Sequence, residues 1–197
     1  MRLLSKRNGY FLFAILATLF FYTRDGDITT SVYATGTAFA LPLALAAMVG
    51  IMCERTGIVN IGIEGTMLIS AFVAFFVSSL TQNIMIGLFA AILTGSIMGL
   101  LLALMAVSWR MDQIIAGTIL NILATGLTSF LYVQGKTIPS VFQAIEVPVL
   151  SKIPFFGPVL FIHGPLTFLG LAIILTLYVA IYHTPWGLRS RAVGEHP

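Results

Sequence analysis

Long apolar runs dominate this sequence and decide what it can fold into. A helix that crosses the hydrocarbon core of a bilayer needs about 20 mostly apolar residues, with a range of about 17–25. The runs that qualify are residues 31–53, 57–79, 84–109, 114–132 and 159–182. A sixth run, 9–22, is shorter and needs help from flanking residues or from local thinning of the bilayer.

The low charge content points the same way. Only 9% of the residues are charged, against about 25% in a typical soluble domain. A chain this apolar cannot cover itself with polar surface in water. We therefore predict an all-α integral membrane protein, a polytopic helical bundle with about six transmembrane helices that forms a single domain over residues 1–197.

The first apolar run could be mistaken for a cleaved signal sequence. Arg2, Lys6 and Arg7 precede it, as basic residues do in a secretory signal. The residues that follow, Tyr22-Thr23-Arg24-Asp25, contain no small-x-small cleavage site. We therefore predict that this run is retained as a membrane anchor.

The positions of the basic residues predict the orientation. The net charge of +3 does not indicate nucleic-acid binding, because the basic residues are scattered at the ends of apolar runs, where membrane proteins carry them. With six spans and a cytoplasmic N-terminus, the residues on the cytoplasmic side are Arg2, Lys6, Arg7, Arg55, Arg110, Arg189 and Arg191. Only Arg24, Lys136 and Lys152 then lie outside. The excess of positive charge inside favours this topology in the cell membrane.

The stretch 134–158 is the longest segment between apolar runs. Its four prolines, Pro139, Pro148, Pro154 and Pro158, exclude a long helix. Under the predicted topology it forms an extracytoplasmic loop. It can serve either as a contact for an extracytoplasmic partner or as a packed connector.

The second full-length run opens on polar and flexible residues. Asn60 and Glu64 lie four residues apart and share one face of a helix. A carboxylate within a membrane segment is costly and is a functional hypothesis by default. Nearby glycines weaken the helix, and a broken helix at membrane depth is tolerated where it lines a cavity or is buried in protein. The sequence predicts a discontinuous helix beside a translocation path; the alternative is that Glu64 pairs with Arg55 near the interface.

The fourth full-length run carries a second polar stripe. Gly117, Asn121, Thr125 and Thr128 follow one another at spacings of four, four and three, so they share a face. Such faces usually pack closely against another helix through hydrogen bonds. A pathway-lining role for Asn121 and Thr125 is the alternative interpretation. Gly95 and Gly99 in the preceding run form a G-x-x-x-G pattern, which indicates helix packing.

No residue set predicts catalysis, a metal site or a cofactor. His163, His183 and His196 lack the spacing of metal ligands, and no cysteine or carboxylate cluster supports them. The phosphate-binding pattern G-x-x-x-x-G-K-[ST] does not occur in the sequence. If ATP powers transport, the ATPase must be another chain.

Three stretches carry a resemblance to a known family. They read ERTGIVNIGIEGTM at 54–67, DQIIAGTILN at 112–121 and TPWGLRSRAVGEHP at 184–197. The chain resembles permeases of the branched-chain amino-acid and simple-sugar family of ATP-binding-cassette transporters, in its nucleoside branch. The resemblance implies a permease subunit that forms part of the membrane pathway for nucleosides or simple sugars. It also implies an ATPase partner, a second permease subunit, identical or homologous, and an extracytoplasmic substrate-binding protein.

In that family, the loop after the long spanning helix docks on the ATPase. The resemblance assigns this role to the cytoplasmic loop 184–197, and within it to Gly187, Arg189, Arg191, Gly194 and Glu195. Two glycines and short-spaced charges suit a tight turn or a short helix in a partner's groove. Permeases of the family continue with further helices after this motif, so we expect the chain to be an N-terminal fragment.

Two other functions are compatible with the residues. In the first, an ion gradient drives a secondary transporter and Glu64 is the coupling site. In the second, the chain is a membrane scaffold without transport. The motif at 184–197 favours the ATP-driven importer over both.

Overall fold

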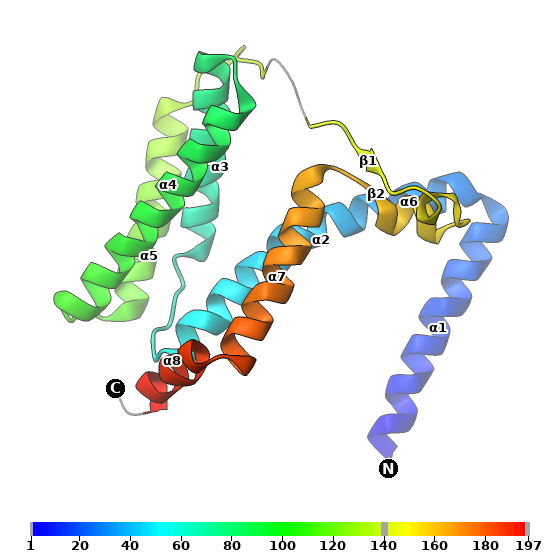
Figure 1. Ribbon diagram of the computed structural model, residues 1–197, viewed down its shortest axis with the longest axis horizontal. Helices are drawn as coiled ribbons and strands as arrows, with labels where there is room; N and C mark the ends of the chain where they lie inside the picture. Colours follow the sequence, from blue (N-terminus) through cyan, green and yellow to red (C-terminus); the bar gives the residue numbers. More distant parts are fainter. Residues whose placement is uncertain (1, 139–141, 196–197) are drawn as a thin grey trace. The chain divides into compact units, whose positions relative to one another are not determined.

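The computed structural model describes residues 2–138 and 142–195, and the described part is almost entirely helical (Figure 1). Its α-helices are α1 (Arg2–Arg24), α2 (Gly26–Arg55), α3 (Ile63–Thr81), α4 (Ile84–Ala103), α5 (Gln113–Leu131), α6 (Phe156–Phe161), α7 (Pro165–His183) and α8 (Pro185–Glu195). A π-helical turn, η1 (Leu104–Ser108), continues α4, and a 3-10 turn, η2 (Leu150–Lys152), precedes α6.

Five of these segments are long and apolar enough to cross a membrane. They are Gly26–Arg55, Ile63–Thr81, Ile84–Ser108, Gln113–Leu131 and Pro165–His183. The apolar part of α1, Gly9–Arg24, is shorter, as the length of the first run predicts. The predicted all-α, polytopic membrane class is confirmed, with five candidate spans among the described residues where about six were predicted.

The chain forms two compact units. The first contains the residues up to Ala44 together with Gln143–Ala172, and the second contains Leu45–Phe142 and the residues from Ile173 onward. Helices α2 and α7 therefore each contribute residues to both units.

Three helices, α3, α4 and α5, pack together in the second unit (Figure 1). Their buried core consists of Met98, Leu102, Met105, Ala116 and Leu120. Helices α3 and α4 form a hairpin whose turn is closed by Asn83, since its side chain accepts a hydrogen bond from the N–H of Met85 at 2.9 Å. Gly87 permits the closest approach in this hairpin, because a Cβ there would lie 2.6 Å from the carbonyl oxygen of Ala74. Of the G-x-x-x-G pair, Gly95 faces Ser70 of α3, whereas Gly99 faces open space.

The second predicted span differs from the observed helix at its start. The run begins at Gly57, but α3 begins only at Ile63. Helix α2 ends in a Schellman motif: Gly57 has a positive φ of 81°, and the N–H groups of Gly57 and Ile58 donate to the carbonyls of Glu54 (3.1 Å) and Cys53 (3.0 Å). Segment 57–62 then runs without helical structure and links α2 to α3. Because α3 is continuous from Ile63 to Thr81, the predicted discontinuous helix is found only as a late helix start.

The last predicted span, 159–182, is wrong at its start. Helix α6 ends at Phe161, and α7 starts only at Pro165. Between them, strand β2 (Ile162–His163) pairs in an antiparallel register with β1 (Ile145–Glu146), with Ile145 opposite His163. Pro165 suits the first turn of a helix because it has no backbone N–H to leave unsatisfied. A count of apolar residues does not detect this break, because His163 and Gly164 are only two residues within a long apolar run.

The predicted loop 134–158 contains more structure than a plain connector. Strand β1 and η2 lie inside it, and α6 begins within it at Phe156. Val149 and Phe155 adopt positive φ angles of 73° and 65° just before η2 and α6. Pro139 lies outside the described residues.

Candidate functional site

The irregular segment 57–62 is held by a glutamine at the start of α5. The N–H of Val59 donates to Oε1 of Gln113 at 2.7 Å, and Nε2 of Gln113 donates to the carbonyl oxygen of Gly57 at 3.4 Å. Gln113 is itself fixed at the first turn of α5, where the Asp112 carboxylate accepts hydrogen bonds from the N–H groups of Ile114 and Ile115. In a helix, the N–H of Val59 and the carbonyl of Gly57 would pair with other backbone groups. Here the side-chain amide of Gln113 pairs with both.

A second side-chain amide, that of Asn121 on α5, forms hydrogen bonds with the backbone at the start of α3. The residue at the N-cap position, Gly62, has no side chain that can cap the helix. Instead, the N–H of Gly65 donates to Oδ1 of Asn121 at 2.7 Å, while Nδ2 of Asn121 donates to the carbonyl oxygen of Ile61 at 3.1 Å. Backbone groups outside a regular helix need such partners wherever water does not reach them.

Glycines allow the two helices to come this close. A Cβ on Gly65 would lie 2.7 Å from both Cα and Oδ1 of Asn121, and a Cβ on Gly117 would lie 2.8 Å from the backbone N of Gly62. Real Cβ atoms do not approach other atoms this closely. The small residues on both sides are therefore required for the contact that places Asn121 over the N-terminus of α3.

Three of the four predicted pathway residues line one hollow of about 400 Å³ between α3 and α5. Glu64, Asn121 and Thr125 lie around it, together with Gly65, Leu68, Ile122 and Gly126. The side chain of Glu64 is exposed. The hollow thus combines a carboxylate, an amide and a hydroxyl with apolar walls, which is the composition of small-molecule sites.

The fourth predicted residue, Asn60, lies elsewhere. Its Nδ2 is 3.8 Å from the Cys53 sulfur atom, and its Oδ1 is buried with no hydrogen-bond partner among the described residues. Since segment 57–62 is not helical, the spacing of four no longer brings Asn60 and Glu64 to one helix face. The geometry assigns Asn60 to the packing of the irregular segment.

The residues predicted for ATPase coupling lie on the short helix α8, which joins α7 through a tight elbow. The N–H of Gly187 donates to the Thr184 hydroxyl at 3.2 Å, and Thr184 donates to the carbonyl of Ala180 at 2.5 Å. Gly187 is buried, and a Cβ there would meet the carbonyl groups of Ala180 and Ile181. A glycine is thus required where α8 turns back onto the end of α7.

The two arginines of α8 point to different surroundings. The guanidinium of Arg191 lies 5.7 Å from the centroid of the Tyr182 ring, and its Nε donates to the carbonyl of Gly187 at 3.4 Å. Arg55, at the end of α2, lies over the same ring at 5.9 Å. Arg189 is exposed. Arg191 therefore holds α8 against the helix ends, while Arg189 is available to a partner.

The C-terminal part of α8 touches the end of α2. Gly194 lies against the backbone of Arg55 and Gly57, because a Cβ on Gly194 would lie 3.0 Å from the N of Gly57 and would collide with the Arg55 carbonyl. Glu195 is exposed at the end of the helix. His196 and Pro197, the last residues of the predicted coupling loop, lie outside the described residues.

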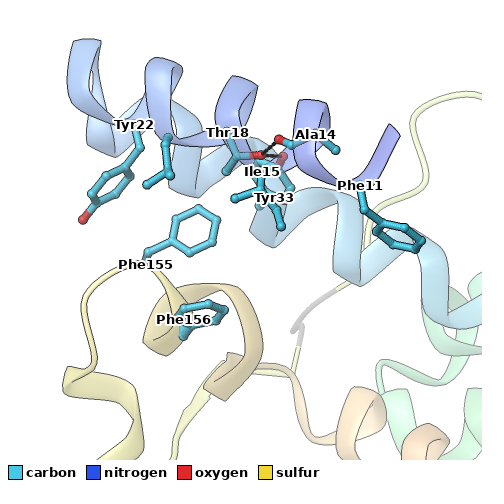
Figure 2. Close-up of a pocket in the computed structure, with 9 residues that line it drawn as sticks. Phe11, Ala14, Ile15, Thr18, Tyr22, Tyr33, Phe155 and Phe156 are labelled. Carbon is cyan, nitrogen blue, oxygen red and sulfur yellow. Dashed lines mark hydrogen bonds between the residues drawn. The ribbon is translucent and has the colours of Figure 1, made fainter. Parts of the chain in front are cut away.

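The first unit contains a separate apolar groove of about 430 Å³, which sequence reasoning missed (Figure 2). Tyr22 and Tyr33 both pack edge-to-face on the Phe155 ring, with centroids 5.5 Å and 5.4 Å apart. The hydroxyl groups of Thr18 and Tyr33 are hydrogen-bonded to each other. With its few polar groups paired in this way, the groove offers little for recognising a polar solute.

Gln113 is the other feature that sequence reasoning missed. It follows Asp112, whose position before an apolar run is a helix N-cap signal. A polar residue at the first turn of a helix is usually solvated, so only the three-dimensional contact with segment 57–62 reveals what Gln113 does.

The sequence matches a family model described as branched-chain amino acid transport system / permease component over residues 32–197. It is 38% identical over 172 residues to the guanosine ABC transporter permease protein NupQ of Bacillus subtilis, covering 81% of this chain and 54% of that protein. The nucleoside ABC transporter permease protein NupC of Lactococcus lactis is 37% identical, over 81% of this chain and 54% of the relative.

A putative glucose ABC transporter permease protein, TsgC13 of Haloferax volcanii, is 30% identical, over 80% of this chain and 50% of the relative. The chain thus spans about half the length of the curated relatives it matches. No solved structure matches it.

Proposed function

This chain belongs to the branched-chain amino acid transport system permease family, and on that premise we propose that it forms part of the membrane pathway of an ATP-binding-cassette importer. One structural observation carries the proposal furthest. Helix α3 starts, after the irregular segment 57–62, beside a hollow lined by a carboxylate, an amide and a hydroxyl. Transporters commonly use helix ends and adjoining irregular backbone to build substrate sites.

Nucleosides are the substrate class that we propose, with simple sugars second. Relatives named for guanosine and nucleoside transport support this order, and one named for putative glucose transport supports the second class. The chemistry of the hollow is compatible with it. A carboxylate such as Glu64 accepts hydrogen bonds from sugar hydroxyls or from the N–H groups of a purine, while Asn121 and Thr125 can both donate and accept.

The proposed partners follow from the family. We propose that a separate ATPase subunit docks on α8, that a second permease subunit completes the pathway, and that a binding protein delivers the solute. The exposed surface of α8 supports docking, because it combines Arg189 with Trp186 (52% exposed), Leu188 (62%) and Val193 (58%). Arginine and tryptophan are over-represented among residues that dominate binding energy at protein interfaces.

The contact between the ends of α2 and α8 supports the proposed topology. Arg55 and Arg191 approach the same Tyr182 ring, so the end of α2 and helix α8 belong to one side of the membrane. Four spans separate them, which is consistent with a cytoplasmic position for both and with a cytoplasmic N-terminus.

Uptake by a Glu64→Gln variant tests the proposed pathway. In the protein that contains this chain, co-expressed with its ATPase and binding protein, uptake of labelled guanosine should fall at least about tenfold because a charge-assisted hydrogen bond to the solute is lost. Thr118→Ala is the matched control: Thr118 is exposed on α5 and bonds only to its own helix, at the carbonyl of Ile114. Equal uptake by both variants, at equal membrane levels, would remove Glu64 from the pathway.

A further inference from the structure

We propose that segment 57–62 transmits movement of α8 to the hollow between α3 and α5, and that Gln113 is the positioning residue that makes this transmission possible. The inference rests on the proposed function and extends it to residues outside both the hollow and α8. It depends on three contacts that follow one another along the chain.

The first contact joins α8 to the beginning of the segment. Gly194 packs against the backbone of Arg55 and Gly57 with no side chain between them; a Cβ on Gly57 would lie 3.5 Å from the Cα of Gly194. Closely packed protein is hardly compressible and transmits displacement. A shift of the C-terminal end of α8 therefore reaches Gly57 directly.

The second contact fixes segment 57–62, so that a shift of Gly57 does not merely bend the segment. A stretch of six residues without helical hydrogen bonds can bend freely unless something fixes it. Gln113 bonds to Val59 and Gly57 at the same time, at 2.7 Å and 3.4 Å, and its backbone belongs to the capped first turn of α5. Gly117 adds a close backbone contact one turn further along α5. The segment thus moves with the N-terminal part of α5 as one body.

The third contact joins the end of the segment to the hollow between α3 and α5. Asn121 bonds to Ile61 at the end of the segment and to Gly65 in the first turn of α3, and it also lines the hollow. Glu64 is the residue before Gly65. A displacement of the segment therefore changes the position of the Asn121 amide relative to the Glu64 carboxylate, two of the three polar groups proposed to contact the solute.

A second arrangement of the segment could satisfy a buried acceptor at Asn60. Its Oδ1 is buried without a hydrogen-bond partner among the residues described, and burial of an unsatisfied acceptor is unfavourable. A movement that brought a donor to this oxygen would be favourable. Coupling between distant sites requires such an element with two arrangements, and both sites must bias it.

The test compares Gln113→Ala and Gln113→Glu with Thr118→Ala in the complete permease, reconstituted in proteoliposomes with its ATPase and binding protein. Three quantities are measured: ATPase recovered with the permease, ATP hydrolysed, and labelled guanosine imported per ATP. We expect Gln113→Ala to keep its ATPase and to hydrolyse ATP while guanosine imported per ATP falls by about tenfold, within the usual range of allosteric coupling. Gln113→Glu keeps the acceptor for Val59 but cannot donate to Gly57, so its ratio should be intermediate.

The outcomes separate the inference from the proposed function. A Gln113→Ala complex whose import and hydrolysis fall in the same proportion, so that their ratio equals that of Thr118→Ala, would overturn the inference, because Gln113 would then be merely structural. If Gln113→Ala does not assemble, guanosine imported per ATP is compared between Gln113→Glu and Thr118→Ala. Equal values would then overturn the inference. Wild-type protein without ATP-driven uptake would contradict the proposed function itself, and the inference with it.

Discussion

The side-chain amide of Asn121, on α5, caps the N-terminus of α3: its Oδ1 accepts a hydrogen bond from the N–H of Gly65 at 2.7 Å. The same amide donates to Ile61 at 3.1 Å. Helix caps usually come from the residue that precedes the helix, but here that residue is Gly62. The cap from a neighbouring helix makes the local structure of α3 depend on its packing against α5.

The first prediction concerns this cap. Asn121→Ala leaves the N–H of Gly65 and the carbonyl of Ile61 without their partners, and an unsatisfied buried group costs about 1–3 kcal/mol. We expect a lower melting temperature in detergent and loss of guanosine uptake. Thr118→Ala, on the same helix, should melt as the wild type does. An unchanged melting temperature for Asn121→Ala would contradict the capping role.

The second prediction concerns the glycine beneath that amide. Gly65→Ala places a Cβ 2.7 Å from Cα of Asn121, and overpacking of this kind costs about 1–3 kcal/mol or more. We expect reduced stability and reduced uptake. Gly99→Ala in α4 is the control, since a Cβ there meets nothing within 4 Å, and alanine should stabilise that helix by about 1 kcal/mol. Equal behaviour of the two variants would refute the close contact.

The third prediction separates the two arginines of α8. Arg189→Glu should reduce co-purification of the ATPase by about tenfold or more, since it reverses an exposed charge at the proposed interface. Lys152→Glu is the matched control, an exposed charge reversal in the predicted extracytoplasmic loop. Arg191→Ala should instead lower the melting temperature slightly, because a cation–π contact with Tyr182 is worth about 0.5–1 kcal/mol at an exposed site. Full ATPase recovery with Arg189→Glu would exclude Arg189 from the interface.

The fourth prediction concerns topology. In a variant lacking the single cysteine, Cys53→Ser, new cysteines at the exposed positions Gln143 and Val193 report the two sides of the membrane. An impermeant thiol reagent added to intact cells should label Gln143→Cys. It should label Val193→Cys only after the membrane is permeabilised. The reverse pattern would invert the proposed orientation.

Much of the fold could be predicted from the sequence, because lipid imposes one strong constraint. Every apolar run of sufficient length must satisfy its backbone internally, and a helix does this. The absence of helix at 57–62, before the start of α3, was also predictable, since its glycines weaken a helix. The break before Pro165 was not, because β2 depends on pairing with β1, in which Glu146 lies opposite Ile162.

The candidate site was only partly predictable, and the reason lies in the backbone. The stripe on α5 was read correctly as sharing a face, which brings Asn121 and Thr125 to one hollow. The pairing of Asn60 with Glu64 assumed helical geometry through a segment that is not helical. Gln113 was missed because nothing in the sequence distinguishes a solvated glutamine from one that bridges Val59 and Gly57.

The most direct test of the central claim, that this chain is part of an ATP-driven importer, is uptake by the reconstituted system. The protein containing this chain is placed in proteoliposomes with its ATPase and binding protein, and labelled guanosine uptake is followed with ATP at the ATPase side or with an imposed proton or sodium gradient. We predict uptake that requires both the ATPase and hydrolysable ATP, and that persists when ionophores collapse the gradients. Uptake driven by an ion gradient without ATPase, and abolished by Glu64→Gln, would contradict the account and favour a secondary transporter.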